Sequence, residues 1–402
     1  MANVSSSNGL EKRPKLRFPG FDEPYVLHRI GDIYAERSER GAADMELLSV
    51  TMNGGVMQRS EIEGKDNSSE DKSNYKVVRK GDMVYNSMRM WQGANGVSPY
   101  DGIVSPAYTV LTAKLPICNE YFAALFKNYK LINEFKKNSQ GMTSDTWNLK
   151  YPQNKTIKVY LPRVTEQEKV ASLLVTLDKR IAAQATLVEQ LKKYKRGVMQ
   201  RIFRNMSILS PSGFETVQLS AIFKKVSRRN SNGEIKNVIT NSAEYGLIPQ
   251  RDFFDKDIAV DGNTSNYYVI EHGDFVYNPR KSNTAPYGPF NRYEREERGI
   301  ISPLYTCLVL QADIEPSYLA WYFKSDAWYR YIYDNGSQGV RHDRVSMTDD
   351  LLMGIPVIIP SKEAQLKIAN LLDCLESRFQ TELSQYESLK SIRVALLQQL
   401  FI

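Results

Sequence analysis

The chain has 402 residues, of which 42% are hydrophobic, so it is long enough to form more than one buried core. Its formal net charge of +7 favours an anionic partner, either nucleic acid or an anionic membrane surface. Three isolated cysteines argue against a disulfide framework, and there is neither a signal-like apolar start nor an apolar run of membrane-spanning length, so we expect a cytoplasmic protein with no membrane partner.

In chain order, the first feature is an internal repeat. The hexapeptide Gly-Asp-Met-Val-Tyr-Asn at 81–86 returns as Gly-Asp-Phe-Val-Tyr-Asn at 273–278, and Ser-Gln-Gly at 139–141 returns at 337–339. The offset grows from 192 to 198 residues and then stays at 198 to the end of the chain. A register kept over some sixty residues indicates two copies of one module.

Each copy begins with a mixed region, at 21–161 after a tail at 1–20, and again at 207–360. Short β-like runs alternate there with Gly, Asn, Ser and Pro turns, and one amphipathic helix is predicted in each copy, around 121–135 and 317–333. An aromatic stripe on the second helix could stack bases, but at helical spacing we interpret it as core. Its members are Tyr318, Trp321, Tyr322, Trp328 and Tyr331.

Each mixed region is followed by a predicted long helix, at 162–206 and 361–402, which Thr165 or Ser361 can cap. Apolar residues recur in steps of four and three, as in a coiled-coil seam, with matching polar breaks at Gln184 and Glu382 and at Lys195 and Arg393. The predicted seam consists of Val170, Leu174, Leu177, Ile181, Val188, Leu191, Ile368, Leu372, Leu375, Phe379, Tyr386 and Leu389. We therefore predict an α+β protein with two mixed α/β domains in tandem, separated by two long helices that form an antiparallel coiled coil with pseudo-two-fold symmetry.

Catalytic motifs are not found in this sequence. It has no Gly-x-x-x-x-Gly-Lys-Ser/Thr phosphate loop, and its three histidines stand singly. The segment at 277–280, Tyr-Asn-Pro-Arg, partly matches the Asn-Pro-Pro-aromatic motif of amino-methyltransferases, but it lacks the second proline and the aromatic residue. We expect no catalytic residue and no metal site.

Polar loops flanking the repeated scaffold are the candidates for DNA contact. They combine Arg and Lys, which bind guanine and phosphate, with amides, which bind adenine, and hydroxyls. The candidates are Asn86, Arg89, Trp91, Gln92, Gln140, Thr143, Ser144, Arg280, Lys281, Asn283, Gln338, Arg341, His342 and Arg344. The alternative is that these are ordinary polar turns, but the loops differ between the copies while the scaffold repeats, which favours two different readers.

These features together resemble the specificity (S) subunits of Type I restriction–modification systems. The resemblance rests on Arg-Phe-Pro-Gly-Phe at 17–21, Ile-Gly-Asp-Ile at 30–33, and the repeated hexapeptide. It also rests on Ser-Gln-Gly, and on Leu-Pro or Ile-Pro followed by a Gln-x-Lys helix, in both halves.

The resemblance implies that each mixed region is a target recognition domain reading one half of a bipartite, asymmetric site in double-stranded DNA. The helices would fix the gap between the half-sites and dock two methyltransferase subunits, together with restriction (motor-nuclease) subunits. Those partners would use S-adenosylmethionine, ATP and Mg; this non-catalytic chain would bind no cofactor itself. Two other classes of protein stay open, a structural scaffold without sequence reading and a self-contained enzyme.

Overall fold

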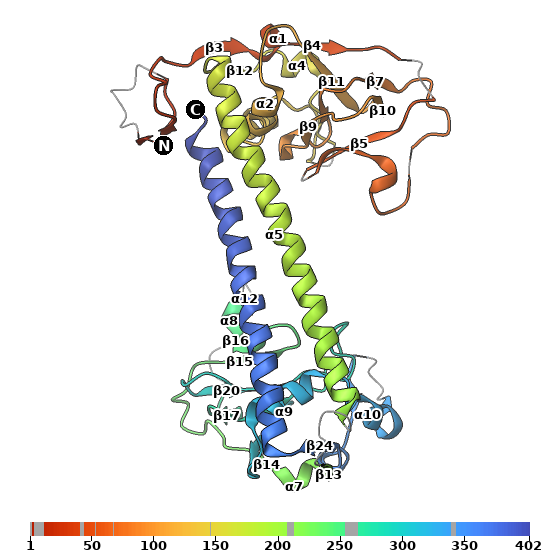
Figure 1. Ribbon diagram of the computed structural model, residues 1–402, viewed down its shortest axis with the longest axis vertical. Helices are drawn as coiled ribbons and strands as arrows, with labels where there is room; N and C mark the ends of the chain where they lie inside the picture. Colours follow the sequence, from red (N-terminus) through yellow and green to blue (C-terminus); the bar gives the residue numbers. More distant parts are fainter. Residues whose placement is uncertain are drawn as a thin grey trace. The chain divides into compact units, whose positions relative to one another are not determined.

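The computed structural model describes residues 2–3, 12–40, 44–52, 54–66, 68–144, 146–206, 213–253, 264–338 and 343–402. These residues form two compact units. Unit 1 comprises Met1–Thr186 and Ser384–Ile402, and unit 2 comprises Leu187–Leu383. Each unit therefore contains one mixed domain together with a part of each long helix (Figure 1).

Unit 1 is built on a four-stranded antiparallel sheet in the order β4-β11-β8-β9. These strands are β4 (Tyr34–Arg37), β11 (Tyr108–Ala113), β8 (Met83–Asn86) and β9 (Asn95–Val97). Antiparallel pairs join β3 (Val26–Arg29) to β12 (Lys158–Leu161), β7 (Lys76–Val78) to β10 (Gly102–Val104), β5 (Leu48–Thr51) to β6 (Gly55–Gln58), and β1 (Ala2–Asn3) to β2 (Leu16–Arg17). The short helices are α1 (Ile30–Ile33), α2 (Asn119–Leu125), α3 (Tyr129–Asn138) and α4 (Tyr151–Asn154), with 3-10 turns η1 (Arg59–Glu61) and η2 (Met90–Gln92).

Unit 2 repeats this arrangement. Its four-stranded sheet has the order β14 (Phe223–Val226), β21 (Thr306–Leu310), β18 (Phe275–Tyr277), β19 (Phe290–Arg292). The pairs are β13 (Phe214–Gln218) with β24 (Pro356–Pro360), β17 (Tyr268–Ile270) with β20 (Gly299–Ile301), β15 (Ile239–Ser242) with β16 (Gly246–Pro249), and β22 (Ser337–Gln338) with β23 (Val345–Ser346). Its short helices are α7 (Leu219–Ile222), α8 (Gln250–Phe253), α9 (Pro316–Lys324), α10 (Tyr329–Asn335) and α11 (Asp349–Met353).

The repeated Gly-Asp pair forms the same turn in both units. Gly81 and Gly273 have φ of 93° and 89°, a left-handed conformation that glycine adopts without strain. The Oδ2 atom of Asp82 accepts from the backbone N–H of Arg79 at 2.8 Å, and that of Asp274 accepts from the N–H of Glu271 at 2.9 Å. These repeated residues therefore support the scaffold itself.

A second repeated residue, the glutamine after the proline, joins each long helix to its domain. Gln167 donates from Nε2 to the carbonyl of Pro162 at 3.0 Å, and its Oε1 accepts from the N–H of Cys118 at 3.1 Å. Gln365 makes the equivalent bonds to Pro360, at 2.8 Å, and to the N–H of Glu315, at 2.9 Å. Both glutamines are buried, so each satisfies backbone groups that water cannot reach.

The two long helices are α5 (Val164–Arg204) and α12 (Lys362–Gln399), which lie side by side within each unit (Figure 1). Every residue of the predicted seam is buried or half-buried. Ser361 caps α12, since its Oγ accepts from the N–H of Ala364 at 3.4 Å. The prediction that Thr165 caps α5 is wrong, because α5 already begins at Val164.

Ion pairs explain the polar break of the predicted seam at Lys195 and Arg393. Arg393 of α12 pairs with Asp178 of α5 in unit 1, and Lys195 of α5 pairs with Glu376 of α12 in unit 2. A step of 17 residues forward along α5, from 178 to 195, is matched by 17 residues backward along α12, from 393 to 376. The helices are therefore antiparallel, as predicted, and each seam cation is neutralised by the facing helix.

Each helix ends in the core of the other copy's domain. Val170 and Leu174, near the start of α5, belong to the core of unit 1, and Phe203, near its end, belongs to that of unit 2. The start of α12 belongs to the core of unit 2, and its end belongs to that of unit 1. Just after this end, Phe401 packs edge-on against Tyr121 of unit 1, with 5.1 Å between the ring centroids. The core of each domain is thus completed by the other copy's helix.

The single helix predicted in each mixed region is instead two helices, α2 and α3 in unit 1, and α9 and α10 in unit 2. Asn128 is the N-cap of α3, because its Oδ1 accepts from the N–H of Lys130. Its Nδ2 donates to the carbonyl of Leu397 at 2.6 Å, and this contact with α12 holds the break in place. In unit 2 the break falls at 325–328.

The aromatic stripe of unit 2 is core, as interpreted from its spacing. Tyr318, Trp321, Tyr322 and Trp328 are buried. The hydroxyls of Tyr318 and Tyr322 donate to the carbonyls of Ile358 and Pro356, at 2.6 and 3.0 Å, so burial leaves neither unpaired. Among the described residues, no helix is both long enough and apolar enough to cross a bilayer.

The exchanged helix ends predict a crossed stability effect. Phe401→Ala removes a buried ring from the core of unit 1, and we expect it to destabilise that unit by about 3–5 kcal/mol while sparing unit 2. Phe203→Ala is the matched variant, with the opposite expected result. Hydrogen exchange of peptides from each unit in increasing urea measures both, and an effect of Phe401→Ala confined to peptides of unit 2 would contradict the arrangement.

Burial also predicts which thiols react. Cys307 is buried in β21, and burial raises the pKa of its thiol to about 12, so roughly one molecule in 10,000 carries the thiolate at pH 8. Cys374 is exposed on α12. We expect a thiol reagent at pH 8 to modify Cys374 rapidly and Cys307 only after denaturation; the rapid phase should vanish in Cys374→Ser. Rapid labelling of Cys307 in the folded chain would show that its strand is open.

Candidate nucleic-acid interface

In unit 1, the structure brings together the two loops in which DNA contacts were predicted. The backbone N–H of Leu149 donates to the carbonyl of Ser87 at 2.8 Å and joins the segment 139–149 to the loop after β8. Trp91 and Trp147 meet edge to face, with 5.3 Å between their centroids and 81° between their planes. Lys136 lies 5.9 Å from the Trp91 ring, within range of a cation–π interaction. The two loops therefore form one continuous surface.

Most of the predicted side chains on this surface are accessible. Arg89, Gln140, Thr143 and Ser144 are exposed, and Trp91 and Gln92 are half-buried. No acid lies within ion-pair distance of Arg89 among the described residues, so its charge is available to an anionic partner. Thr143 is held in a turn, since Oγ1 of Thr146 donates to its carbonyl at 2.9 Å and accepts from its N–H at 3.2 Å.

Asn86 and its repeat Asn278 have a structural role that the sequence pattern does not show. The Oδ1 atom of Asn86 accepts from the N–H of Met88 at 3.0 Å, and that of Asn278 accepts from the N–H of Arg280 at 3.0 Å. Both are Asx turns, in which an asparagine side chain shapes its own loop. The Nδ2 of Asn278 donates to the carbonyl of Asn241 at 3.2 Å, whereas the Nδ2 of Asn86 has no hydrogen-bond partner among the described residues and is left for another partner.

Unit 2 joins its two predicted loops in the same way. The N–H of Val345 donates to the carbonyl of Pro279, and the N–H of Lys281 to that of Asp343, both at 2.9 Å. Arg280 and Arg344 are paired across an antiparallel bridge. Arg280 and Asn283 are exposed, whereas Lys281 and Arg344 are half-buried. Arg341, His342 and the side chain of Gln338 lie outside the described residues.

A groove of about 530 Å³ lies beside the loops of unit 2. It is lined in part by Lys281, Ser282, Asn283, Tyr287 and Tyr333. Tyr333 is 71% exposed, so a large aromatic face lies open next to a cation and an amide. Such a combination suits a nucleic-acid strand, which offers bases for stacking and phosphates for charge.

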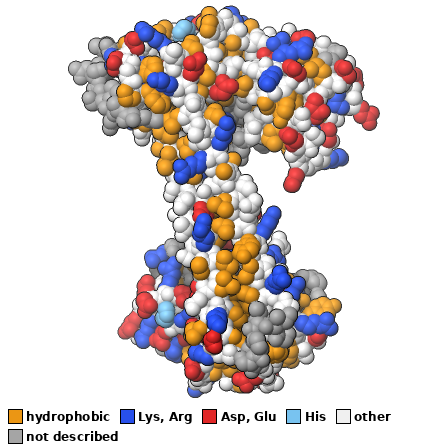
Figure 2. Space-filling view, viewed as in Figure 1, with side chains coloured by type: hydrophobic (Ala, Val, Ile, Leu, Met, Phe, Trp, Pro, Cys, Tyr) orange, Lys and Arg blue, Asp and Glu red, His pale blue; other side chains and the backbone are white. Residues whose placement is uncertain are grey.

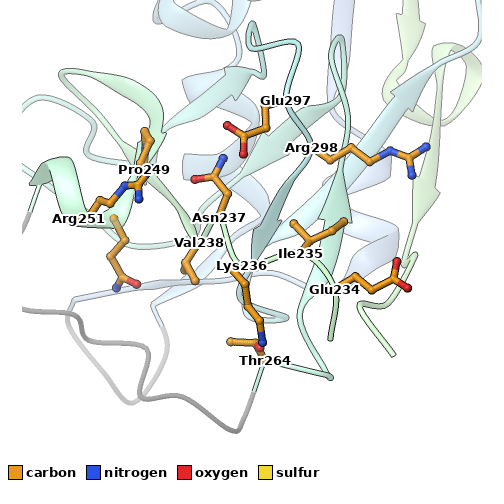
Figure 3. A pocket seen from close by; sticks show the side chains of 11 residues that line it. Glu234, Ile235, Lys236, Asn237, Val238, Pro249, Arg251, Thr264, Glu297 and Arg298 are labelled. Atoms are coloured by element: carbon orange, nitrogen blue, oxygen red, sulfur yellow. The ribbon is translucent and has the colours of Figure 1, made fainter. Parts of the chain in front are cut away.

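Another cavity of unit 2, of about 840 Å³, is lined by charged and uncharged residues from 234–238, 249–251, 264 and 297–298 (Figure 3). Its acids are Glu234 and Glu297, and its bases are Lys236, Arg251 and Arg298; none of its lining residues is His or Cys. Arg298 is paired outside this group, with Glu271 at 2.8 Å. Across the described residues, no group of three His, Cys, Asp or Glu side chains is placed to hold a metal ion.

Comparison with protein-family models gives no match, and comparison with curated proteins gives none either. Solved structures do match. The Type-I restriction-modification system S subunit from M. genitalium is 15% identical, with a TM-score of 0.57 over 97% of this chain and 99% of that chain. A chain from work on complex assembly and conformational transition of the type I R-M system is 16% identical, with a TM-score of 0.56 over 96% and 99%. The HsdS subunit from Thermoanaerobacter tengcongensis is 16% identical, with a TM-score of 0.51 over 97% and 98%.

The chain has the S-subunit fold. The likeness covers both repeated halves and both long helices, so the fold class that the sequence predicts is confirmed. Two residues that flank the contact between the loops of unit 1, Met88 and Asn148, were not predicted from the sequence. The signal that could have found them is their position in the sequence. Met88 lies two residues after the Asx-turn asparagine, and Asn148 directly precedes the buried Leu149.

The two tryptophans of unit 1 generate a prediction about loop order. Trp147→Ala removes the ring that packs on Trp91, so we expect faster hydrogen exchange in peptides covering 87–94 and 139–149 and no change elsewhere in unit 1. Trp147→Phe keeps an aromatic ring and should restore most of the protection. Unchanged exchange in Trp147→Ala would mean that backbone bonds alone hold the two loops together.

Proposed function

We propose that this chain is the sequence-specific DNA-binding specificity subunit of a Type I restriction–modification complex. In this role it reads a bipartite, asymmetric site and catalyses no reaction itself. One observation carries the proposal: each of two repeated scaffolds joins a pair of loops through a backbone bond to the carbonyl that follows the repeated asparagine, Leu149 to Ser87 and Val345 to Pro279. The three solved structures described above are from Type I restriction–modification systems, and they support the same role.

The two loop surfaces differ in chemistry, which supports an asymmetric site. Unit 1 presents two tryptophans and Arg89 with amides and hydroxyls, whereas unit 2 presents three cations, Arg280, Lys281 and Arg344, on one short segment pair. Arginine and lysine favour guanine and phosphate, while amides favour adenine. Two surfaces of such different composition suit two different half-sites.

The long helices supply candidate docking surfaces for two methyltransferase subunits. Tyr194 of α5 and Ile392 of α12 occupy matching positions, 198 residues apart, and are 60% and 50% exposed. Leu366 and Leu371 in unit 2 and Val394 in unit 1 are also exposed, and hydrophobic side chains are visible among charged ones along the helices (Figure 2). The matched pair Tyr194 and Ile392 favours two copies of one partner.

Catalysis and cofactors then belong to the partners in this proposal. The methyltransferase subunits use S-adenosylmethionine, and the restriction subunits use ATP and Mg. The present chain contributes the choice of DNA sequence, and its helices set the distance between the half-sites.

Methylation mapping tests the proposal. The chain is expressed with the methyltransferase subunit encoded beside it, and host DNA is sequenced for methyladenine. We expect methylation at a two-part motif with a fixed gap, lost when the chain is omitted. Replacing residues 21–161 with the matching domain of another S subunit should change one half of the motif and leave the other half and the gap intact.

Two results would contradict the proposal. Methylation of the same motif without this chain would remove its role as reader and leave a structural scaffold. Methyl transfer by the pure chain with S-adenosylmethionine alone would show that it is an enzyme.

A further inference from the structure

The loop between β18 and β19 borders two grooves of unit 2. Its residues 281–283 and 286–287 line the groove described above, whereas 284–285 and 288–289 line a second one of about 650 Å³, the helix-side groove. The helix-side groove continues onto α5 at positions 195, 196 and 199, and onto α12 at positions 376 and 380. It therefore leads from a loop that reads bases in the proposed function to the two long helices.

Cations outnumber acids along the helix-side groove. Its acids are Glu244, Glu294 and Glu376, and its cations are Lys195, Arg196, Arg292, Arg295 and Lys324. Lys195 pairs with Glu376, and the Nη1 of Arg292 lies 3.5 Å from the Oε1 of Glu294. Arg196, Arg295 and Lys324 have no ion-pair partner among the described residues. The groove consequently keeps an excess of positive charge for an anionic ligand.

Part of this charge pattern is repeated in unit 1. The set Lys324, Glu376 and Lys195 of unit 2 corresponds, at offsets of 197 and 198 residues, to the set Lys127, Asp178 and Arg393 of unit 1. In both units the acid pairs with the cation of the facing helix. Loss of hydration lowers the pKa of the remaining lysine in each unit; the cation of the pair adds to this effect, and the acid opposes it. Each set thus holds two cations for one acid.

The remaining lysines of the two sets differ in their hydrogen bonds. The Nζ of Lys127 donates to the carbonyl of Met52 at 3.1 Å. Lys324 has no hydrogen-bond partner among the described residues, and its Nζ lies 4.6 Å from the centroid of the Trp321 ring. The Nε of Arg292, in the same groove, is buried and also unpaired. Because an unpaired buried donor costs free energy, the groove of unit 2 favours a ligand that supplies acceptors.

We propose that the helix-side groove of unit 2 binds the phosphate backbone of the DNA between the two half-sites. This inference rests on the proposed function, in which the helices set the gap, so that DNA passing from the loop toward the helices belongs to the gap. Lysine and arginine contacts to phosphates position a protein on DNA without reading its sequence. An acidic segment of a partner protein is the alternative ligand, and the continuity of the groove with the loop favours DNA.

The test uses the chain assembled with its methyltransferase subunit, and duplexes that carry the mapped motif. Lys324→Gln combined with Arg295→Gln removes two unpaired cations of the groove without changing either long helix. We expect about 10-fold weaker binding to every duplex at a fixed salt concentration, and a slope of log Kd against log salt that is lower by about two. The base preference at both half-sites should stay the same, because the lost contacts are with phosphates.

Uncharged phosphate analogues locate the contact. In the unmodified complex, a methylphosphonate in the gap should weaken binding when it lies next to the half-site that is retained after replacement of residues 21–161. In the double variant the same methylphosphonate should have little further effect, because the cations that contact this phosphate are gone. A methylphosphonate at the far end of the gap should weaken binding equally in both proteins.

Lys224→Gln combined with Arg251→Gln is the matched control. Both residues are exposed in unit 2, neither has an ion-pair partner among the described residues, and neither lines the helix-side groove. This control removes the same net charge, so it should leave the effect of each methylphosphonate unchanged. Hydrogen exchange in peptides covering 316–324 verifies that α9 keeps its protection in the double variant.

The outcomes distinguish this inference from the proposed function. If the double variant keeps the salt dependence of the unmodified complex, or alters the base preference of one half-site, the groove does not bind gap phosphates and the inference is wrong. If the variant weakens assembly with the methyltransferase subunit while the assembled complex keeps its salt dependence, the groove binds an acidic segment of that partner instead of DNA. In these cases the bipartite preference of the unmodified complex still supports the proposed function. If the unmodified complex shows no sequence preference, the proposed function fails.

Discussion

The burial of one apolar stripe on two long helices is the constraint on which the rest of the structure depends. Neither α5 nor α12 can leave its seam in water, and the opposed charges of Asp178 with Arg393 and Glu376 with Lys195 favour the antiparallel register. An antiparallel pair delivers the end of each helix to the domain of the other copy. Phe203, from the first copy, therefore completes the core of unit 2. Phe401, from the second copy, completes the core of unit 1.

Because of this exchange, the side chains of the two domains can differ from each other wherever they do not support the scaffold. Residues that repeat between the copies satisfy backbone groups: Asp82 and Asp274 hold a turn, Gln167 and Gln365 fix the helix start, and Asn86 and Asn278 shape a loop. The side chains of the loops that follow these residues do not repeat between the copies. The repeated motif is consequently the frame of the loops, and the side chains proposed to discriminate between bases lie beside it.

The periodic features of the fold were predictable from the sequence, whereas features held by distant contacts were not. The repeat, the seam and the aromatic core of unit 2 follow from spacing alone, because a buried helix face imposes its period on the sequence. The break between α2 and α3 depends on Asn128 bonding a carbonyl of α12, 269 positions away, which no local pattern contains. The loops of the site could be chosen as polar segments next to repeats, but their joining and the turn role of Asn86 required the backbone bonds of the folded chain.

The backbone bonds that join the loops explain why a rigid frame suits the proposed reading of DNA. A side chain on a mobile loop tip would have to be ordered on binding, and that entropy would oppose affinity for right and wrong sequences alike. The backbone bonds from Leu149 to Ser87 and from Val345 to Pro279 instead fix the loops, so in the proposed function the side chains beside them are placed before DNA binds. Changing the side chain at such a position alters which base edge is satisfied without altering the frame. In the proposed function, a duplicated scaffold with two independently variable loop surfaces therefore reads two unrelated half-sites, while the helices that join its halves stay the same.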